Sequence, residues 1–200
     1  MNKVDSRMDF SFPLFKVEYR NENAVEQLAQ HLAHRFRLSP YDHELVILCI
    51  GTDRSTGDAL GPLVGTKLKP QAPQLLHVYG TLEEPVHAIN LGEKIQYIQG
   101  THQNATIVAI DACLGQFSNV GNINVADGPL KPGAGVKKDL PSVGTFHITG
   151  IVNVGGFMEY FVLQNTRLYI VMRMADIIAA ALFKAALLTS SDQNKYGSRM

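Results

Sequence analysis

Two short runs of apolar residues place the strongest constraint on how this chain folds. Residues 45–50 read LVILCI and residues 106–110 read TIVAI. Each run has the length of a strand and lacks polar alternation, a pattern typical of strands that are buried on both faces of a parallel sheet. The sequence therefore predicts an α/β fold in which helices cover both faces of the sheet.

Helical patterns alternate with these runs. Residues 23–36 carry Ala24, Leu28, Leu32 and Phe36 at a spacing of four, which is one apolar stripe of an amphipathic helix. The same reasoning predicts helices at 60–68, 85–99, 148–164 and 175–188, and strands at 75–79, 122–126 and 167–172.

Length and charge narrow the class of protein. The chain has 200 residues, about one domain's worth. Its 18 Lys and Arg residues balance 18 Asp and Glu residues, which excludes a polybasic nucleic-acid binder. The two cysteines imply no disulfide framework. We expect an N-terminal arm (1–20), a single α/β domain (21–190) and a flexible C-terminal tail (191–200).

No segment predicts export or membrane insertion. The first 20 residues mix charges with aromatic side chains, unlike a secretory signal. The longest apolar stretch, residues 177–188, is interrupted by Lys184 and is shorter than the ~20 residues of a membrane span. We therefore expect a cytoplasmic protein with no membrane or nucleic-acid partner.

Two acidic residues follow neighbouring predicted strands. Asp58 lies in the segment 51–62 (GTDRSTGDALGP), and Asp111 follows TIVAI directly. Ligands of such sheets bind at the carboxyl ends of the strands, so these side chains are expected to meet in one cleft. Close carboxylates cannot both ionise freely, and the result is an acid-base pair. The alternative is that Asp58 caps the following helix and Asp111 orders a loop.

His147 is the third candidate, because it follows a glycine- and proline-rich loop over residues 127–141. With Asp58 and Asp111 it would complete a metal site. Cys113 offers rival nucleophilic chemistry, but no neighbouring cation favours its thiolate. We expect substrate binding from five further residues of the strand ends and the loop: Asp53, Glu83, Gly133, Gly135 and Thr145.

Four blocks of the sequence resemble a known family. They are GTDRSTGDALGP (51–62), VAIDAC (108–113), KPGAGV (131–136) and GTFHITGIVNVGGF (144–157). In this order they resemble the YyaC-type family of proposed spore peptidases of spore-forming bacteria. More distantly, DALGP and AIDA resemble blocks of the germination protease and of hydrogenase maturation endopeptidases.

The resemblance implies a fold and an activity. The fold is phosphorylase/hydrolase-like, a three-layer α/β/α arrangement with a mostly parallel, mixed central sheet. The activity is that of an endopeptidase of sporulating cells, whose catalytic pair is Asp58 and Asp111. The hydrogenase endopeptidases imply a nickel-type site at Asp58, Asp111 and His147, so either no cofactor or a divalent metal (nickel or zinc) is expected.

The expected partner is a protein or peptide substrate, with small acid-soluble spore proteins as the candidate. A non-catalytic sporulation protein that binds a partner on the same scaffold is the alternative function. The apolar pattern of residues 175–188 has two equally compatible explanations. These residues either form the interface of a homodimer or are buried in the core.

Overall fold

The structure, a computed structural model, describes residues 12–39, 44–74, 76–133 and 140–196. The strands are β1 (Phe15–Glu18), β2 (Leu45–Cys49), β3 (Leu76–Tyr79), β4 (Thr106–Gly115), β5 (Asn122–Asp127) and β6 (Phe146–Val154). The helices are α1 (Ala24–Arg37), α2 (Leu60–Leu68), α3 (Leu91–Thr101), α4 (Glu159–Gln164) and α5 (Leu168–Tyr196).

The six strands form one mixed sheet in the order β1-β5-β6-β4-β2-β3. Strand β2 pairs in parallel with β3 and β4, and β4 pairs in parallel with β6. Strand β5 runs antiparallel to both β6 and β1. The mostly parallel, mixed sheet expected from the sequence is confirmed.

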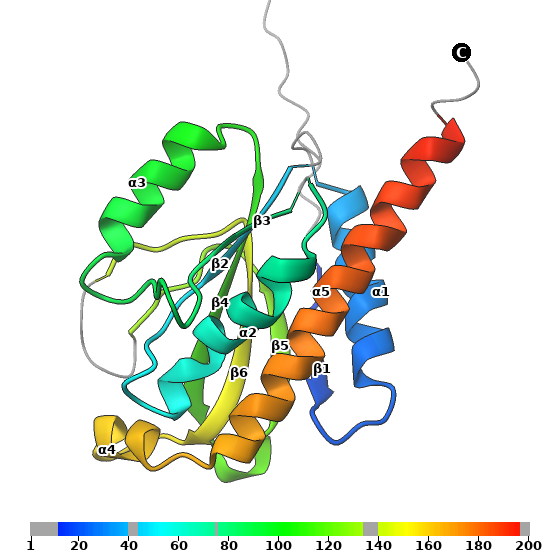
Figure 1. The fold of residues 1–200 in the computed structure, drawn as a ribbon. Coiled ribbons are helices and arrows are strands. Elements are labelled where there is room, and N and C mark those ends of the chain that lie inside the picture. Colours follow the sequence, from blue (N-terminus) through cyan, green and yellow to red (C-terminus); the bar gives the residue numbers. More distant parts are fainter. Residues whose placement is uncertain (1–11, 40–43, 75, 134–139, 197–200) are drawn as a thin grey trace, which may run out of the picture.

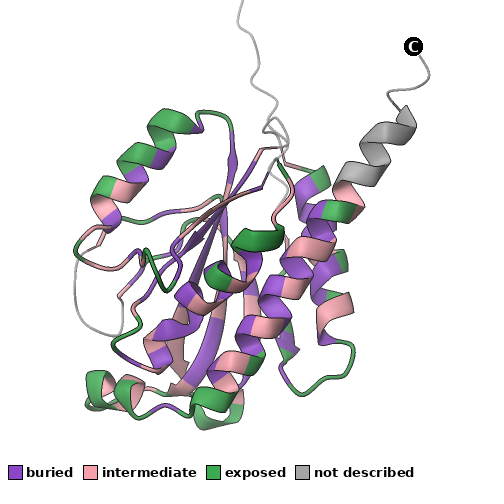
Figure 2. Ribbon diagram, viewed as in Figure 1, coloured by how far each residue is buried: buried purple, intermediate pink, exposed green. Residues whose placement is uncertain are grey.

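Helices cover the sheet on both faces. Helices α1, α2 and α5 lie together on one face and α3 lies on the other (Figure 1). All five residues of β2 are buried, as expected for a strand between two helical layers. Figure 2 shows the buried residues concentrated on the sheet and on the helix faces turned toward it. The three-layer α/β/α architecture is confirmed.

The predictions for the last third of the chain were partly wrong. Residues 148–164 were expected to form a helix, but most of them belong to strand β6 and the short helix α4. Residues 167–172 were expected to form a strand, but they begin helix α5. A short apolar run fits a buried helix segment as well as a buried strand, so periodicity alone could not separate the two.

The ends of the predicted domain also differ from expectation. Strand β1 pairs with β5, so the sheet reaches into the segment expected to be an arm. Helix α5 extends to Tyr196, into the segment expected to be a tail. Within the described part of the chain, none of the helices combines the length and apolar character needed to cross a membrane.

The apolar run at 175–188 is accounted for by burial within one chain. Ala175, Ile178, Leu182 and Ala185 of α5 are fully buried, and they belong to the core cluster that also contains residues of α1 and α2. The structure thus shows core burial for these residues, and the expected homodimer stays a prediction.

Candidate active site

Asp111 lies inside strand β4, not directly after it. The pairing of β4 with β2 ends where the Ile50 backbone N–H donates to the Ile110 carbonyl, at 2.7 Å. At the next residue, Gly51, the chain of β2 turns away with a φ of +140°. Asp111 therefore stands at the point where β4 loses β2 as its neighbour, while its pairing with β6 continues, and this is the carboxyl-end position expected of it.

Asp58 lies in a short 3-10 helix, Gly57–Ala59, that leads into α2. Its backbone carbonyl accepts a hydrogen bond from Thr52 N–H at 3.1 Å. A Cβ on Gly51 would stand 2.0 Å from this carbonyl oxygen, so Gly51 is required both by its positive φ and by the close approach. The turn from β2 to α2 thus brings Asp58 back beside the end of β2.

Both carboxyl groups line one cleft of about 1080 Å³. Its walls come from the β2–α2 loop, the segment after β3, the loop before β6 and the α4 region. Five exposed apolar side chains form part of the lining: Ile89, Phe157, Met158, Tyr160 and Phe161. Arg54 and Glu159 add one charge of each sign. The acids therefore sit in a mostly apolar cleft that is large enough for several residues of a peptide.

The environment of the cleft opposes ionisation of both acids. Burial raises the pKa of Asp111 well above its ordinary value, and the nearby Asp58 charge raises it further. Burial also raises the pKa of Asp58, although the Thr52 backbone N–H and the charge of His87 partly oppose the rise. Since Asp111 is the more deeply buried acid, it is the one that retains a proton, and Asp58 is the one that ionises first.

The cleft contains a histidine that the sequence analysis passed over. His87 lies on the segment after β3, and this segment is tied to the end of β2 by a hydrogen bond from Gly51 N–H to the Val86 carbonyl at 2.8 Å. Its Nδ1 is buried and has no hydrogen-bond partner among the described residues. The signal in the sequence was the position of His87 after β3, a neighbour of β2, but this position alone does not show that the loop turns His87 into the cleft.

His147, the expected third ligand, is not among the residues that line the cleft. It pairs with Ala109 across β4 and β6, and its Nδ1 lies 2.9 Å from the Gly128 carbonyl oxygen. In the described part of the chain, no histidine, cysteine or acid joins Asp58 and Asp111 in a group whose ligand atoms all lie within 4.8 Å of one another. The donors present therefore do not fit the expected nickel-type site.

Cys113 follows Asp111 by two residues on β4 and is half-buried. Burial raises the pKa of its thiol to about 11, and the nearby Asp111 charge acts in the same direction. The thiolate needed for nucleophilic attack is therefore disfavoured. Cys113 also lies outside the cleft lining, which argues against the nucleophilic alternative.

The expected substrate-binding residues are spread over the molecule. Gly133 lines the cleft. Asp53 and Glu83 are exposed and lie outside the lining. Thr145 lies at the amino end of β6, where its backbone N–H donates to the Ile107 carbonyl, and this is the edge of the sheet away from Asp111. Gly135 lies outside the described residues. Sequence reasoning missed Ser55, which lines the cleft and whose buried Oγ has no hydrogen-bond partner among the residues that the structure describes.

Comparison with known proteins gives a family and a relative. A family model described as "Protein of unknown function (DUF1256)" matches residues 16–181. The chain is 55% identical over 166 residues to a Bacillus subtilis (strain 168) protein described as "Uncharacterized protein YyaC", covering 83% of this chain and 80% of that protein. The expected relation to a YyaC-type family is thereby confirmed.

Proposed function

The chain belongs to the DUF1256 family, and we propose that it is an endopeptidase that uses Asp58 and Asp111 as a coupled acid-base pair. The observation that carries this proposal is the meeting of both carboxyl groups in one open cleft, each with a raised pKa and each affected by burial. Structural carboxylates that cap helices or order loops have no need of such a cleft. Groups with perturbed pKa values in a cleft are typical of catalytic sites.

The different burial of the two acids assigns their roles. Asp58, ionised, takes a proton from a water molecule as the water oxygen adds to the peptide carbonyl carbon. Asp111, protonated, donates a hydrogen bond to the carbonyl oxygen as that oxygen gains negative charge. When the C–N bond breaks, Asp58 returns its proton to the leaving nitrogen. The pair is then restored to one proton and one negative charge.

Other groups in the cleft suit a peptide. The buried Oγ of Ser55 and the Nδ1 of His87 have no partner among the described residues, so each is free to bond with a peptide backbone group. The exposed aromatic and aliphatic rim suits apolar side chains of an extended segment. The substrate we propose is a protein of the sporulating cell, with small acid-soluble spore proteins as the candidates suggested by the resemblance to the germination protease.

The experiment is incubation of the full chain with small acid-soluble spore proteins and with a mixed peptide library, followed by mass spectrometry of the products. We expect new termini inside the substrates that are absent with Asp58→Asn and present with Asp53→Asn, the exposed-acid control. If the unmodified protein cleaves neither the spore proteins nor the library, the scaffold serves the alternative, non-catalytic binding role.

A further inference from the structure

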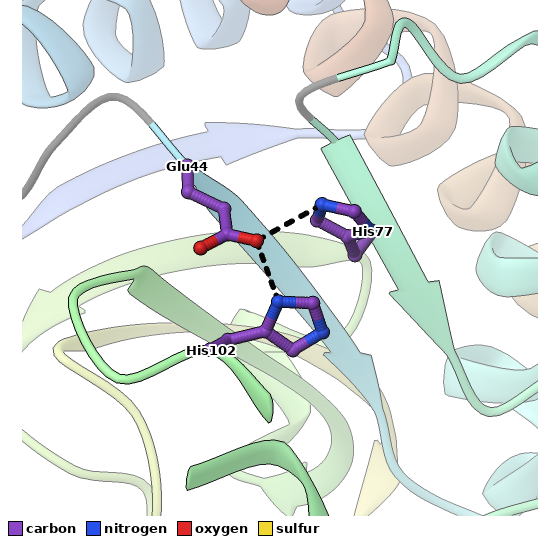
Figure 3. A group of neighbouring side chains, drawn as sticks. All are labelled: Glu44, His77 and His102. Atoms are coloured by element: carbon purple, nitrogen blue, oxygen red, sulfur yellow. Dashed lines mark hydrogen bonds and ion pairs between the residues drawn. The ribbon is translucent and has the colours of Figure 1, made fainter. Parts of the chain in front are cut away.

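A second group of chemistry-bearing side chains lies outside the cleft. Glu44 immediately precedes β2, His77 lies on β3, and His102 directly follows α3 (Figure 3). The Glu44 Oε1 lies 3.1 Å from His77 Nε2 and 2.6 Å from His102 Nδ1. One ligand atom from each of these residues lies within 4.8 Å of the other two. Three elements thus direct two imidazole nitrogens and one carboxylate oxygen toward one point.

The group is separate from the candidate active site. Leu45 pairs with Leu76 at the start of β2 and β3, so Glu44 and His77 lie at the amino end of these strands. Asp58 and Asp111 lie beyond the other end of β2, where the Ile50 N–H donates to the Ile110 carbonyl. The peptidase chemistry proposed above therefore makes no use of Glu44, His77 or His102.

We propose that Glu44, His77 and His102 form a zinc-class site for a divalent transition metal. Two imidazoles and one carboxylate are a ligand set that proteins use for zinc. An ion with bonds of about 2.0–2.2 Å in tetrahedral geometry holds its ligand atoms roughly 3.3 Å apart. The 3.1 Å between Glu44 and His77 is close to this spacing, and the 2.6 Å between Glu44 and His102 must open by a few tenths of an ångström.

The surroundings fit a site that is anchored on one side and open on the other. The His102 side chain is only 5% exposed, whereas those of His77 and Glu44 are 37% and 31% exposed. A metal ion can therefore enter from the side of His77 and Glu44, and a water molecule can occupy the fourth position.

Tyr79 supports the metal-binding form of His102. Its hydroxyl lies 2.7 Å from His102 Nε2. With a metal on Nδ1, His102 carries its proton on Nε2 and donates it to the Tyr79 oxygen. Without the metal, Nδ1–H donates to Glu44, and the Tyr79 O–H donates to Nε2 instead. A hydroxyl serves both states because it is both a donor and an acceptor.

The bound metal would link the amino ends of β2 and β3 to the end of α3. The three residues that these elements contribute, Glu44, His77 and His102, are far apart in the sequence. Because metal binds the folded site and not the unfolded chain, binding stabilises the fold.

The test uses the full chain with any affinity tag removed. Zinc binding is measured by isothermal titration, and the visible spectrum of the Co²⁺-substituted protein reports ligand geometry. We expect one ion per chain and a higher melting temperature with zinc. His77→Gln and Glu44→Gln should each weaken binding by about 10-fold or more, and Tyr79→Phe should weaken it by about 10-fold.

Two matched variants distinguish this site from others. His34→Gln removes an exposed histidine on α1, and Asp58→Asn with Asp111→Asn removes the acids of the cleft. Both should bind zinc as the unmodified chain does. The proposal is overturned if the unmodified chain binds no zinc, or if His77→Gln binds zinc as tightly as His34→Gln. It is also overturned if the double variant Asp58→Asn with Asp111→Asn no longer binds zinc. Peptidase activity is not a readout, so this result is independent of the proposed function.

Discussion

Asp111 is the most deeply buried of the acidic residues in the described part of the chain, and its burial has a direct consequence for chemistry. Its side chain accepts only the hydrogen bond from Ala112 N–H at 2.8 Å among the bonds found in the described part of the chain. One backbone donor does not offset burial beside a second acid, so the pKa of Asp111 stays raised. The same environment that prepares Asp111 to donate a proton makes it unfavourable for folding.

Asp111→Asn should therefore make the fold more stable at neutral pH. Above the ordinary Asp pKa of 3.8, the unfolded chain releases the Asp111 proton while the folded chain keeps it. The free energy of unfolding of the unmodified protein thus falls as pH rises from that value toward the raised pKa. Urea denaturation at several pH values measures the free energy of unfolding of both proteins. The value for Asp111→Asn should exceed that of the unmodified chain by a margin that grows as pH rises and vanishes near pH 4. If Asp111→Asn is more stable than the unmodified chain by the same amount at every pH, the raised pKa of Asp111 is contradicted.

His87 should set the acid side of the activity profile. Its charge lowers the pKa of Asp58, so His87→Gln should raise that pKa and move the acid limb of the pH–rate profile to higher pH. The exposed His34 of α1 provides the control, because His34→Gln should leave the profile in place. Equal profiles for both variants would mean that His87 does not act on Asp58.

At the scale of the site, the sequence was sufficient for the two acids and not for their companions. Asp58 and Asp111 could be predicted because each follows an unmistakable apolar run of the sequence, LVILCI for Asp58 and TIVAI for Asp111. His87 and Ser55 enter the cleft through loop conformations that depend on tertiary hydrogen bonds, such as that from Gly51 to Val86. His147 was misplaced because its region was taken for a helix, whereas in β6 it faces Gly128.

At the scale of the element, the approach of α2 to β2 positions Asp58. A Cβ on Gly61 would lie 2.1 Å from the Ile50 carbonyl oxygen, so the helix backbone rests directly on the end of the strand. The predicted boundaries of α2 agree with the structure because the apolar stretch begins and ends there. Strand β6 was predicted as a helix, and the start of α5 was predicted as a strand. Their burial depends on elements elsewhere in the chain: β6 is buried between β4 and β5, and α5 packs in the core with residues of α1 and α2.

Gly61→Ala should push α2 away from β2. We expect a loss of about 3 kcal/mol in the free energy of unfolding from overpacking against backbone. Gly100→Ala in α3 is the matched control, because nothing lies within 4 Å of its added Cβ. That control should gain roughly 0.5–1 kcal/mol through helix propensity. Chemical denaturation measures both changes, and a Gly61→Ala protein as stable as the control would contradict the close contact.

At the scale of the whole molecule, one ion pair ties the helical layer to the antiparallel side of the sheet. Arg35 of α1 donates to Asp127 at the end of β5 over 2.5 Å, and its side chain is only 2% exposed. The guanidinium also lies over the rings of Phe12 and Phe146. Neither partner of this long-range pair has a sequence signal that identifies the other, so it could not be predicted.

Asp127→Asn should destabilise the fold, because it leaves the Arg35 charge buried without a counter-charge. We expect a loss of about 2–3 kcal/mol, less than for a fully buried pair because Asp127 is partly exposed. The exposed pair of Glu18 and Arg20 supplies the control, and Glu18→Gln should change stability by less than about 0.5 kcal/mol. Thermal and urea denaturation measure both, and equal effects would show that the Arg35 charge is stabilised by other groups.

The central claim is that Asp58 and Asp111 act as one catalytic unit, and a double-variant cycle on peptide cleavage tests it most directly. Cleavage rates are measured for the unmodified chain, Asp58→Asn, Asp111→Asn and the double variant. Each single variant is predicted to lose about 10²–10⁴-fold, and the double variant no more than either single one. Losses that multiply in the double variant, or single variants that cleave at the unmodified rate, would contradict the claim.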